Sequence, residues 1–149
     1  MSQVDKSIEV DLDVTTVYNQ WTQFEDFPRF MEGVESVEQV DDAHLSWTAQ
    51  IGPSTRQWAA EITEQVPDQV IAWRAIGDTR HDGRVTFEPL GAARTRVSLQ
   101  LDFEPQDVAE KAADATNVVD KRVEGDLERF KTFIEERGVE TGGYRQQIR

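Results

Sequence analysis

The chain of 149 residues contains no cysteine, and this absence excludes disulfides, thiol catalysis, thiolate metal sites and redox switching at sulfur. It contains only two histidines, and no group of His, Asp and Glu residues has the spacing of metal ligands. It also has no glycine-rich loop of the kind that cradles phosphates. We therefore expect no metal site and no cofactor.

Long hydrophobic runs are missing as well. No apolar run approaches the roughly 20 residues that span a membrane, so we expect no integral membrane segment. Residues 1–12 alternate acidic with apolar side chains and lack the apolar centre of a signal peptide. These absences predict a cytoplasmic protein.

Positive charge is scarce. The 16 Lys and Arg residues oppose 29 Asp and Glu residues, which gives a net charge of −13 and a pI near 4.5. Such a charge repels phosphate backbones and anionic lipid surfaces, so we expect no nucleic-acid partner. The same acidic surface leaves open a role as a module that binds a basic protein.

The residues that are present are enough for one globular domain. With 38% hydrophobic residues, a chain of this length buries about 70% of the surface that its unfolded form exposes. We predict a single domain over residues 1–138 and a C-terminal tail over residues 139–149, after the helix-stop residue Gly138. The oligomeric state is open, and a homodimer is one of the alternatives.

Alternation of apolar and polar residues predicts strands that are joined by short turns. These strands are expected at residues 4–12, 34–40, 44–51, 56–66, 69–76, 84–89 and 95–103. After the first strand, residues 15–22 predict a short helix capped by Thr15 or Thr16, and a second short helical turn follows around Phe30. Seven strands in short-linked hairpins favour one curved antiparallel sheet.

The turn Pro67-Asp68 predicts a specific register. If this turn is tight, Glu61 lies opposite Arg74 and Ile62 lies opposite Trp73. The first pair would form an outward ion pair and the second an inward apolar pair, which is a self-consistent arrangement.

A long amphipathic helix is predicted at the end of the chain. From Asp107 to Arg137 there is no proline, and apolar residues recur at intervals of three and four. A curved sheet must cover its apolar concave face, and this helix is the one predicted element long enough to do so.

Two stretches resemble a known superfamily. The first comprises Val17, Tyr18, Trp21 and the segment Phe27–Val34, and the second is Gly125–Lys131. Together with the element order, they make the chain resemble the START-like (SRPBCC) superfamily, which includes polyketide cyclase/dehydrases and coenzyme-Q-binding proteins. The resemblance implies an α+β helix-grip (START/Bet v 1-like) fold with an interior cavity for a hydrophobic small molecule. Because this fold hosts both binders and enzymes, the resemblance does not identify the ligand.

The alternation also predicts which side chains point toward the concave face. Three are tryptophans whose indole N–H groups could donate to a ligand carbonyl, and three are alanines that leave volume between them. One interpretation is that the last helix fills this volume and the core is simply packed. The other, which the resemblance favours, is an apolar ligand cavity with aromatic walls. The predicted ligand-binding residues are Trp47, Ala49, Trp58, Ala60, Ile62, Trp73, Ala75, Phe87, Leu99 and Phe130.

No catalytic constellation is evident, and we predict no catalytic residue. An acid–base group would have to be Glu38, Glu64, Tyr18 or His81. Both glutamates lie near strand ends, where side chains reach water, and a bulge would turn Glu38 outward. Tyr18 is more typical of a packing residue with an exposed hydroxyl, and His81 of a solvated loop over residues 77–83.

These observations predict a binding or transport protein for a hydrophobic small molecule such as a polyketide, a prenylquinone or a lipid. Apolar burial would supply most of the affinity. The two alternatives are a polyketide cyclase/dehydrase-type enzyme and the acidic protein-interaction module.

Overall fold

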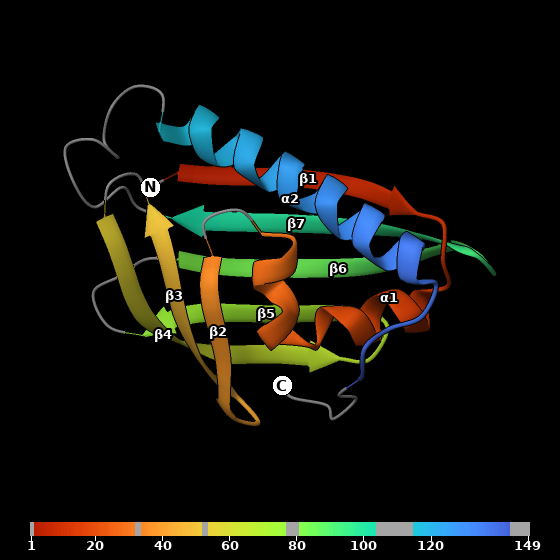
Figure 1. The fold of residues 1–149 in the computed structure, drawn as a ribbon, viewed down its shortest axis with the longest axis horizontal. Helices are drawn as coiled ribbons and strands as arrows, with labels where there is room; N and C mark the ends of the chain where they lie inside the picture. The colour runs from red at the N-terminus through yellow and green to blue at the C-terminus, as the bar shows by residue number, and fades with distance from the viewer. Residues whose placement is uncertain (1, 32–33, 52–53, 77–80, 104–114, 144–149) are drawn as a thin grey trace.

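The computed structural model describes residues 2–31, 34–51, 54–76, 81–103 and 115–143. Within these ranges, one strand is followed by two short helices, six strands and one long helix, which confirms the predicted α+β order (Figure 1). The elements are β1 (Ser2–Val10), α1 (Val14–Trp21), the 3-10 helix η1 (Phe24–Arg29), β2 (Val34–Asp41), β3 (His44–Ile51), β4 (Ser54–Val66), β5 (Val70–Ile76), β6 (His81–Gly91), β7 (Arg94–Phe103) and α2 (Ala115–Arg137).

The strands form one antiparallel sheet in the order β1-β7-β6-β5-β4-β3-β2. Strands β2 to β7 are a meander of consecutive hairpins, and β1 pairs with β7, with Ile8 opposite Val97. Figure 1 shows the sheet curling around its inner face, with α2 running along β1 and α1 and η1 near the C-terminal end of α2. This arrangement is the predicted helix-grip fold.

The hairpin of β4 and β5 contains the two predicted pairs, although the predicted two-residue turn is wrong: residues 67–69 form the turn and Val66 lies opposite Val70. Glu61 lies opposite Arg74, with 3.0 Å between Glu61 Oε1 and Arg74 Nη2, and Ile62 lies opposite Trp73. Asp68 in the turn has φ of 65°, the left-handed conformation that Asp tolerates better than most residues. The register shifts by one residue between Ile62 and Glu64, so a β-bulge changes the direction of the side chains beyond it.

Helix α1 is capped by Asp13. The predicted cap, Thr15 or Thr16, is therefore wrong. The Asp13 carboxylate accepts hydrogen bonds from the backbone N of Thr16 at 3.1 Å and from its Oγ1 at 2.7 Å. Aspartate is among the best N-cap residues because its oxygens satisfy amides that the first helical turn leaves free. The cap fixes the start of a helix that buries Tyr18 and Trp21.

Helix α2 ends as predicted, at Arg137, and Gly138 follows it with φ of 71° and donates its N–H to Ile134 O at 2.8 Å. The predicted start at Asp107 lies outside the described residues. The inward stripe of α2 is Val123, Leu127, Phe130 and Ile134. Polar contacts tie the helix to its surroundings: Lys6 of β1 lies 2.9 Å from Asp120, and Arg129 Nε donates to Phe30 O at 2.9 Å.

The chain after α2 folds back on α1 and η1. Thr141 N donates to Gln20 Oε1 at 2.8 Å, Thr141 Oγ1 lies 2.5 Å from Asp26 Oδ2, and Asn19 Nδ2 donates to Glu140 Oε2 at 2.9 Å. Gln20 is fully buried, so these contacts give its amide group partners that water cannot supply. The first residues of the predicted tail therefore pack against the domain.

Candidate functional site

The inner face of the sheet carries the side chains that the alternation had placed there. The predicted inward residues whose side chains the structure describes are all buried except Ala75, which is half-buried. They are Leu45, Trp47, Ala49, Trp58, Ala60, Ile62, Ile71, Trp73, Val85, Phe87, Val97, Leu99 and Leu101. The structure thus brings the predicted ligand-binding residues into one core, and their role in binding stays a prediction.

Three tryptophans from adjacent strands form what we call the tryptophan stack: Trp47 on β3, Trp58 on β4 and Trp73 on β5. The rings of Trp47 and Trp58 are 6.0 Å apart between centroids and nearly parallel, with 3° between their planes. Trp47 and Trp73 are 6.4 Å apart at 25°. The stack presents flat aromatic surface along the inner face of three strands.

Two small residues make this arrangement possible. Ala60 on β4 is fully buried and lies between the strands of Trp47 and Trp73, whose rings meet across it. Gly83 on β6 lies directly opposite Trp73, and a Cβ at this position would come within 2.1 Å of the indole Cζ2. The indole of Trp73 therefore packs directly on the backbone of Gly83. Part of the volume that the inward alanines were predicted to leave is filled by this indole.

At the other end of the core lies an aromatic cluster, which we define as Trp21, Phe24, Phe27, Phe30 and Phe130. Its rings meet edge to face or tilted: Trp21 and Phe130 are 4.7 Å apart at 71°, and Phe30 and Phe130 are 5.2 Å apart at 67°. Phe87 adjoins this end through Tyr18, at 5.3 Å. The structure thus places two predicted ligand-binding residues, Phe87 and Phe130, away from the stack and beside the cluster.

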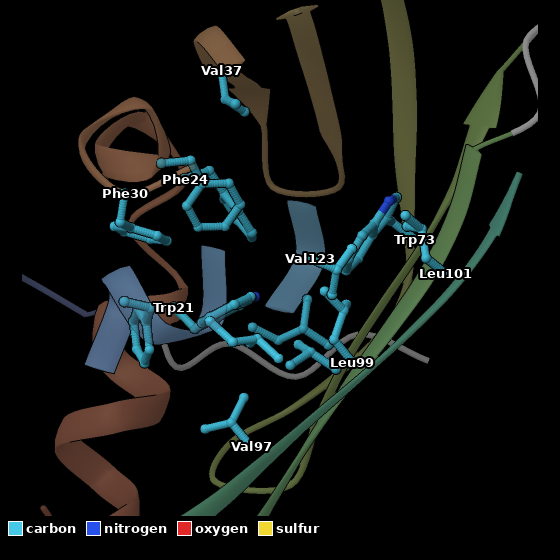
Figure 2. Close-up of a cluster of buried hydrophobic side chains, with 14 of the residues drawn as sticks. Trp21, Phe24, Phe30, Val37, Trp73, Val97, Leu99, Leu101 and Val123 are labelled. Atoms are coloured by element: carbon cyan, nitrogen blue, oxygen red, sulfur yellow. The ribbon is translucent and has the colours of Figure 1, made fainter. Parts of the chain in front are cut away.

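The two ends differ in how completely they exclude solvent. Side chains of the aromatic cluster are 0 to 3% exposed, whereas Trp47 is 4% exposed and Trp58 and Trp73 are each 8% exposed. Leu99, Leu101 and Val123 near the stack show similar residual exposure, of 5 to 7%. In the view of Figure 2, Trp73, Leu101 and Val123 lie on one side and Trp21 and Phe30 on the other. The tryptophan end is the less tightly closed part of the core.

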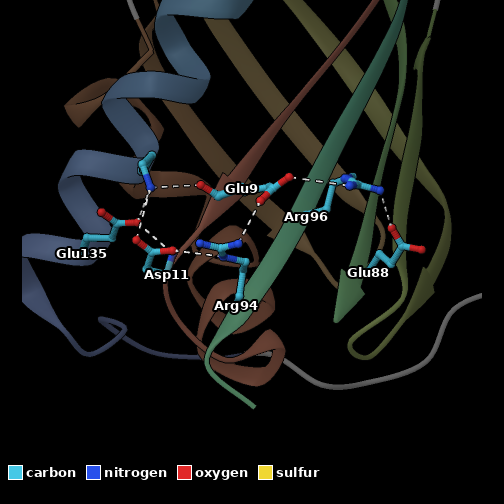
Figure 3. A network of polar contacts seen from close by, with 7 residues as sticks. Glu9, Asp11, Glu88, Arg94, Arg96 and Glu135 are labelled. Carbon is cyan, nitrogen blue, oxygen red and sulfur yellow. Dashed lines mark hydrogen bonds and ion pairs between the residues drawn. The ribbon is translucent and has the colours of Figure 1, made fainter. Parts of the chain in front are cut away.

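Charged side chains gather on the outside of the sheet. No Asp, Glu, Lys, Arg or His residue among those whose side chains the structure describes is buried. Figure 3 shows the pattern at β1, β7 and β6, where Arg96 lies 2.9 Å from Glu88 and 3.6 Å from Glu9, and Arg94 lies 3.4 Å from Asp11. Because these ion pairs are exposed, each contributes little to stability. The charges lie at the surface, and the described part of the interior carries none.

Neither glutamate considered as an acid–base group faces the interior. Glu38 is exposed and lies opposite Ser46, because register shifts on both sides of it turn β2 as predicted. Glu64 pairs with Arg84 at 2.9 Å on the outer face, and the bulge after Ile62 places Gln65 inside in its stead. Both side chains therefore reach solvent, as expected from their places near strand ends.

The remaining two acid–base candidates differ from each other. Tyr18 is fully buried, and its hydroxyl is buried with it, so the expected exposed hydroxyl is wrong. His81 begins β6 opposite Phe103, so residues 81–83 belong to a strand and not to the predicted loop. Residues 77–80 of that loop lie outside the described residues.

Two indole N–H groups in the core, those of Trp21 and Trp73, are buried and have no hydrogen-bond partner among the described residues. Of the two, Trp73 belongs to the tryptophan stack. The described part of the chain contains no cluster of three or more His, Asp and Glu side chains that could hold a metal ion. No helix within it is long and apolar enough to cross a membrane.

A groove lies outside the core. It is an open groove of about 480 Å³ between η1 and α2, lined by Arg29, Arg129, Phe133 and neighbouring acidic residues of α2. Its charges are of both signs and exposed, and it does not adjoin the tryptophan stack.

Sequence reasoning missed Gly83, which seats Trp73, and Gln65, which is buried beyond the bulge after Ile62. A signal for Gly83 was present, because a glycine opposite a tryptophan in a sheet is typical of an aromatic ring covering bare backbone. It was overlooked because residues 77–83 were assigned to a loop. Nothing in the alternation indicated the bulge that buries Gln65.

Comparison with known proteins gives consistent results. The family model described as "Polyketide cyclase / dehydrase and lipid transport" matches residues 10–132. An uncharacterized 17.2 kDa protein of Streptomyces lincolnensis is 51% identical over 149 residues, which is 99% of each chain. A crystal structure from Deinococcus radiodurans is 27% identical with a TM-score of 0.73, covering 93% of this chain and all of that one.

Other structures share the fold at lower identity. The Zhui aromatase/cyclase from Streptomyces has a TM-score of 0.75 at 18% identity, with 96% of this chain and 99% of that chain covered. A START superfamily protein from Mycobacterium smegmatis has a TM-score of 0.70 at 18% identity, with 91% and 95% covered. At such identities the likeness concerns the fold alone.

Proposed function

Because this chain belongs to the polyketide cyclase/dehydrase and lipid transport family, we propose that it binds a hydrophobic small molecule and carries it unchanged. The ligand, a polyketide, a prenylquinone or a lipid, would lie between the sheet and α2, against the tryptophan stack. The binding residues would be those predicted from the sequence, with Trp47, Trp58, Trp73, Ala49, Ala75 and Leu99 nearest to the ligand. No cofactor is needed for such a role.

The observation that carries the proposal is the contrast in closure within one apolar core. The three tryptophans of the stack and the nearby Leu99, Leu101 and Val123 are 4 to 8% exposed, whereas the aromatic cluster is 0 to 3% exposed. A ligand that completes the packing at the stack would gain about 25 cal/mol per Å² of apolar surface removed from water, before the costs of association. The lack of buried charge at the described positions suits an apolar ligand.

The proposal is tested by native mass spectrometry of the protein purified from its own host, followed by organic extraction. A stoichiometric adduct that organic solvent releases is expected. The adduct should be lost in Ala75→Leu, because this half-buried position lies next to Trp73 on β5. It should persist in the matched outer-face variant Glu64→Ala. An adduct retained by Ala75→Leu would place the ligand elsewhere, and its loss in both variants would indicate general destabilisation.

One observation favours the alternative of a cyclase or dehydrase. Tyr18 is a buried hydroxyl group within the core, 5.3 Å from Phe87 between ring centroids, and buried phenols can act as proton donors. If the protein is an enzyme, Tyr18→Phe should abolish turnover of a polyketide substrate while binding is retained. A carrier should keep its ligand in this variant and show no turnover to lose.

A further inference from the structure

We propose that the indole N–H of Trp73 donates a hydrogen bond to an uncharged oxygen of the ligand, so that the site selects neutral carbonyl compounds over carboxylates. This inference rests on the proposed function, since it names the ligand class for the same site. It makes Trp73 the specificity-determining residue of the stack.

The first argument is the state of the donor. Only 8% of Trp73 is exposed, and its indole N–H has no hydrogen-bond partner among the described residues. A buried donor without a partner costs about 1–3 kcal/mol, and native proteins rarely retain one without a reason. A ligand oxygen that accepts from this N–H would remove that cost.

The second argument concerns the rings around the donor. Trp47 lies nearly parallel to Trp73, at 25°, so the Trp73 N–H, which lies in its ring plane, does not point into the face of Trp47. Trp21 differs, although its buried N–H also lacks a hydrogen-bond partner among the described residues. Its ring meets Phe130 edge to face at 4.7 Å, in a cluster that is closed on all sides, and aromatic faces are weak acceptors of N–H groups.

The third argument is that the indole is held in place. Trp73 packs on Gly83, where any side chain would overlap the six-membered ring of the indole. On the other neighbouring strand, Trp73 lies directly opposite Ile62. A donor fixed by packing loses little conformational entropy when it binds an acceptor. This rigidity is what selectivity between similar ligands requires.

The fourth argument excludes anions. No cation among the described side chains is buried, and the two arginines nearest in the strand order face outward, Arg74 toward Glu61 and Arg84 toward Glu64. A carboxylate in this core would lose its hydration without gaining a counter-charge, and a protein charge of −13 also opposes its approach. A single neutral donor suits a ketone, a quinone or an ester.

The test uses three probes of the same shape: 2-acetylnaphthalene, 2-ethylnaphthalene and 2-naphthoate. Calorimetry on the full chain should give the ketone and the hydrocarbon measurable affinity and the carboxylate at least about tenfold weaker affinity than the ketone. In Trp73→Phe, the ratio of ketone to hydrocarbon affinity should fall by about three- to tenfold, since one neutral hydrogen bond is lost. In the matched variant Trp21→Phe, which removes a buried indole N–H outside the proposed binding residues, this ratio should stay within about twofold of the original.

The outcomes separate the two proposals. If the ketone and the hydrocarbon bind but the ratio is unchanged in Trp73→Phe, or the carboxylate binds best, the inference is wrong and the binding function stands. If no probe binds the unaltered protein, both the site and the inference fail.

A measurement on the unaltered protein guards against a variant that does not fold. The chain has four tryptophans, so an ¹⁵N-indole spectrum contains four side-chain N–H signals. The ketone should shift the Trp73 proton downfield and the hydrocarbon should not. Equal shifts with both probes would overturn the inference.

Discussion

The aromatic cluster and the tryptophan stack belong to one apolar core and consist of the same kinds of residue, yet they pack differently. In the cluster, the edge of one ring meets the face of another, as between Trp21 and Phe130, and solvent is excluded almost completely. In the stack, the rings lie nearly parallel, as between Trp47 and Trp58, and keep residual exposure. Edge-to-face packing closes a core in three dimensions, whereas parallel rings leave one flat surface for a further partner.

The difference arises from what supports each region. The cluster is supplied by α1, η1 and α2, which surround it on several sides. The stack lies on strands and is seated by Ala60 and Gly83, and η1 contacts it through Phe27, whose ring lies 5.7 Å from that of Trp47. We infer that the cluster contributes mainly to stability and the stack mainly to binding, and four substitutions can break or sharpen this division.

The largest effect is expected for Trp21→Ala. Removing a fully enclosed tryptophan leaves a cavity that the surrounding rings cannot fill, so the free energy of unfolding should fall by about 3–5 kcal/mol. Urea denaturation measures this loss as a lower midpoint with an unchanged m-value. Trp58→Ala is the matched control, and it should cost at least about 1 kcal/mol less, because this side chain is nearer to solvent. Equal losses for the two variants would remove the division.

Gly83→Ala should have the next largest effect. The new Cβ overlaps the Trp73 indole, so the ring must move and the free energy of unfolding should fall by about 1–3 kcal/mol. Gly125→Ala in α2 is a fitting control, because its Cβ would meet only the flexible end of Arg129. That variant should gain a few tenths to about 1 kcal/mol from helix propensity. If Gly83→Ala is also neutral or stabilising in thermal unfolding, the indole is not held as described.

Thr141→Val tests how the end of the chain supports the cluster. The change removes hydrogen bonds of the hydroxyl with Asp26 and Gln20 while keeping the shape of the side chain, and we expect a loss of about 1 kcal/mol. Val139→Ala, at an exposed site, should be nearly neutral. A neutral Thr141→Val in the same urea experiment would mean that these contacts do not stabilise α1.

The smallest effect is expected for Asp13→Ala, and it should depend on pH. Partial burial raises the pKa of the Asp13 carboxyl. Hydrogen bonds from the hydroxyl and the amide of Thr16 lower this pKa by more than burial raises it, so it lies below its ordinary value of 3.8. A lowered folded-state pKa means that the cap stabilises the protein above about pH 5 and loses this contribution as pH falls below about 4.

At neutral pH, Asp13→Ala should therefore cost about 0.5 kcal/mol, the lower end of the range for the loss of an N-cap. The difference from the unaltered protein should shrink when unfolding is measured at progressively lower pH below about 4. Asp42→Ala, at an exposed turn position, serves as the control and should show no comparable change. A cost that stays constant down to acidic pH would show that the carboxylate does not act as the cap.

Most of the fold follows from local sequence signals. Alternation gives the strands. The pairing of Glu61 with Arg74 was predicted from a two-residue turn at Pro67-Asp68, and it holds because the bulge after Ile62 offsets the extra turn residue Gln69. Apolar residues at intervals of three and four predict the last helix, and Gly138 predicts where it ends. These signals depend on neighbours in the chain, which a sequence displays directly.

The missed features depend on contacts between distant segments. The bulge after Ile62 reverses Glu64 and Gln65, and no local rule places an extra residue in one strand of a pair. The partner of Gly83 becomes evident only when the start of β6 is known. The burial of the Tyr18 hydroxyl depends on how α1 sits against β6. The apolar list of predicted site residues was within reach of the sequence, whereas the division between cluster and stack was not.

The pairing of β1 with β7 has a consequence for how the protein is made. Ile8 cannot meet Val97 until β7 has been synthesised, and at about 5–20 residues per second this takes roughly 5 to 20 seconds on the ribosome. The hairpins of β2 to β7 can form in turn as they emerge, since each joins neighbours in sequence. Of the seven strands, β1 leaves the ribosome first but is among the last to pair. Helix α2, which packs along β1, must form its contacts later still.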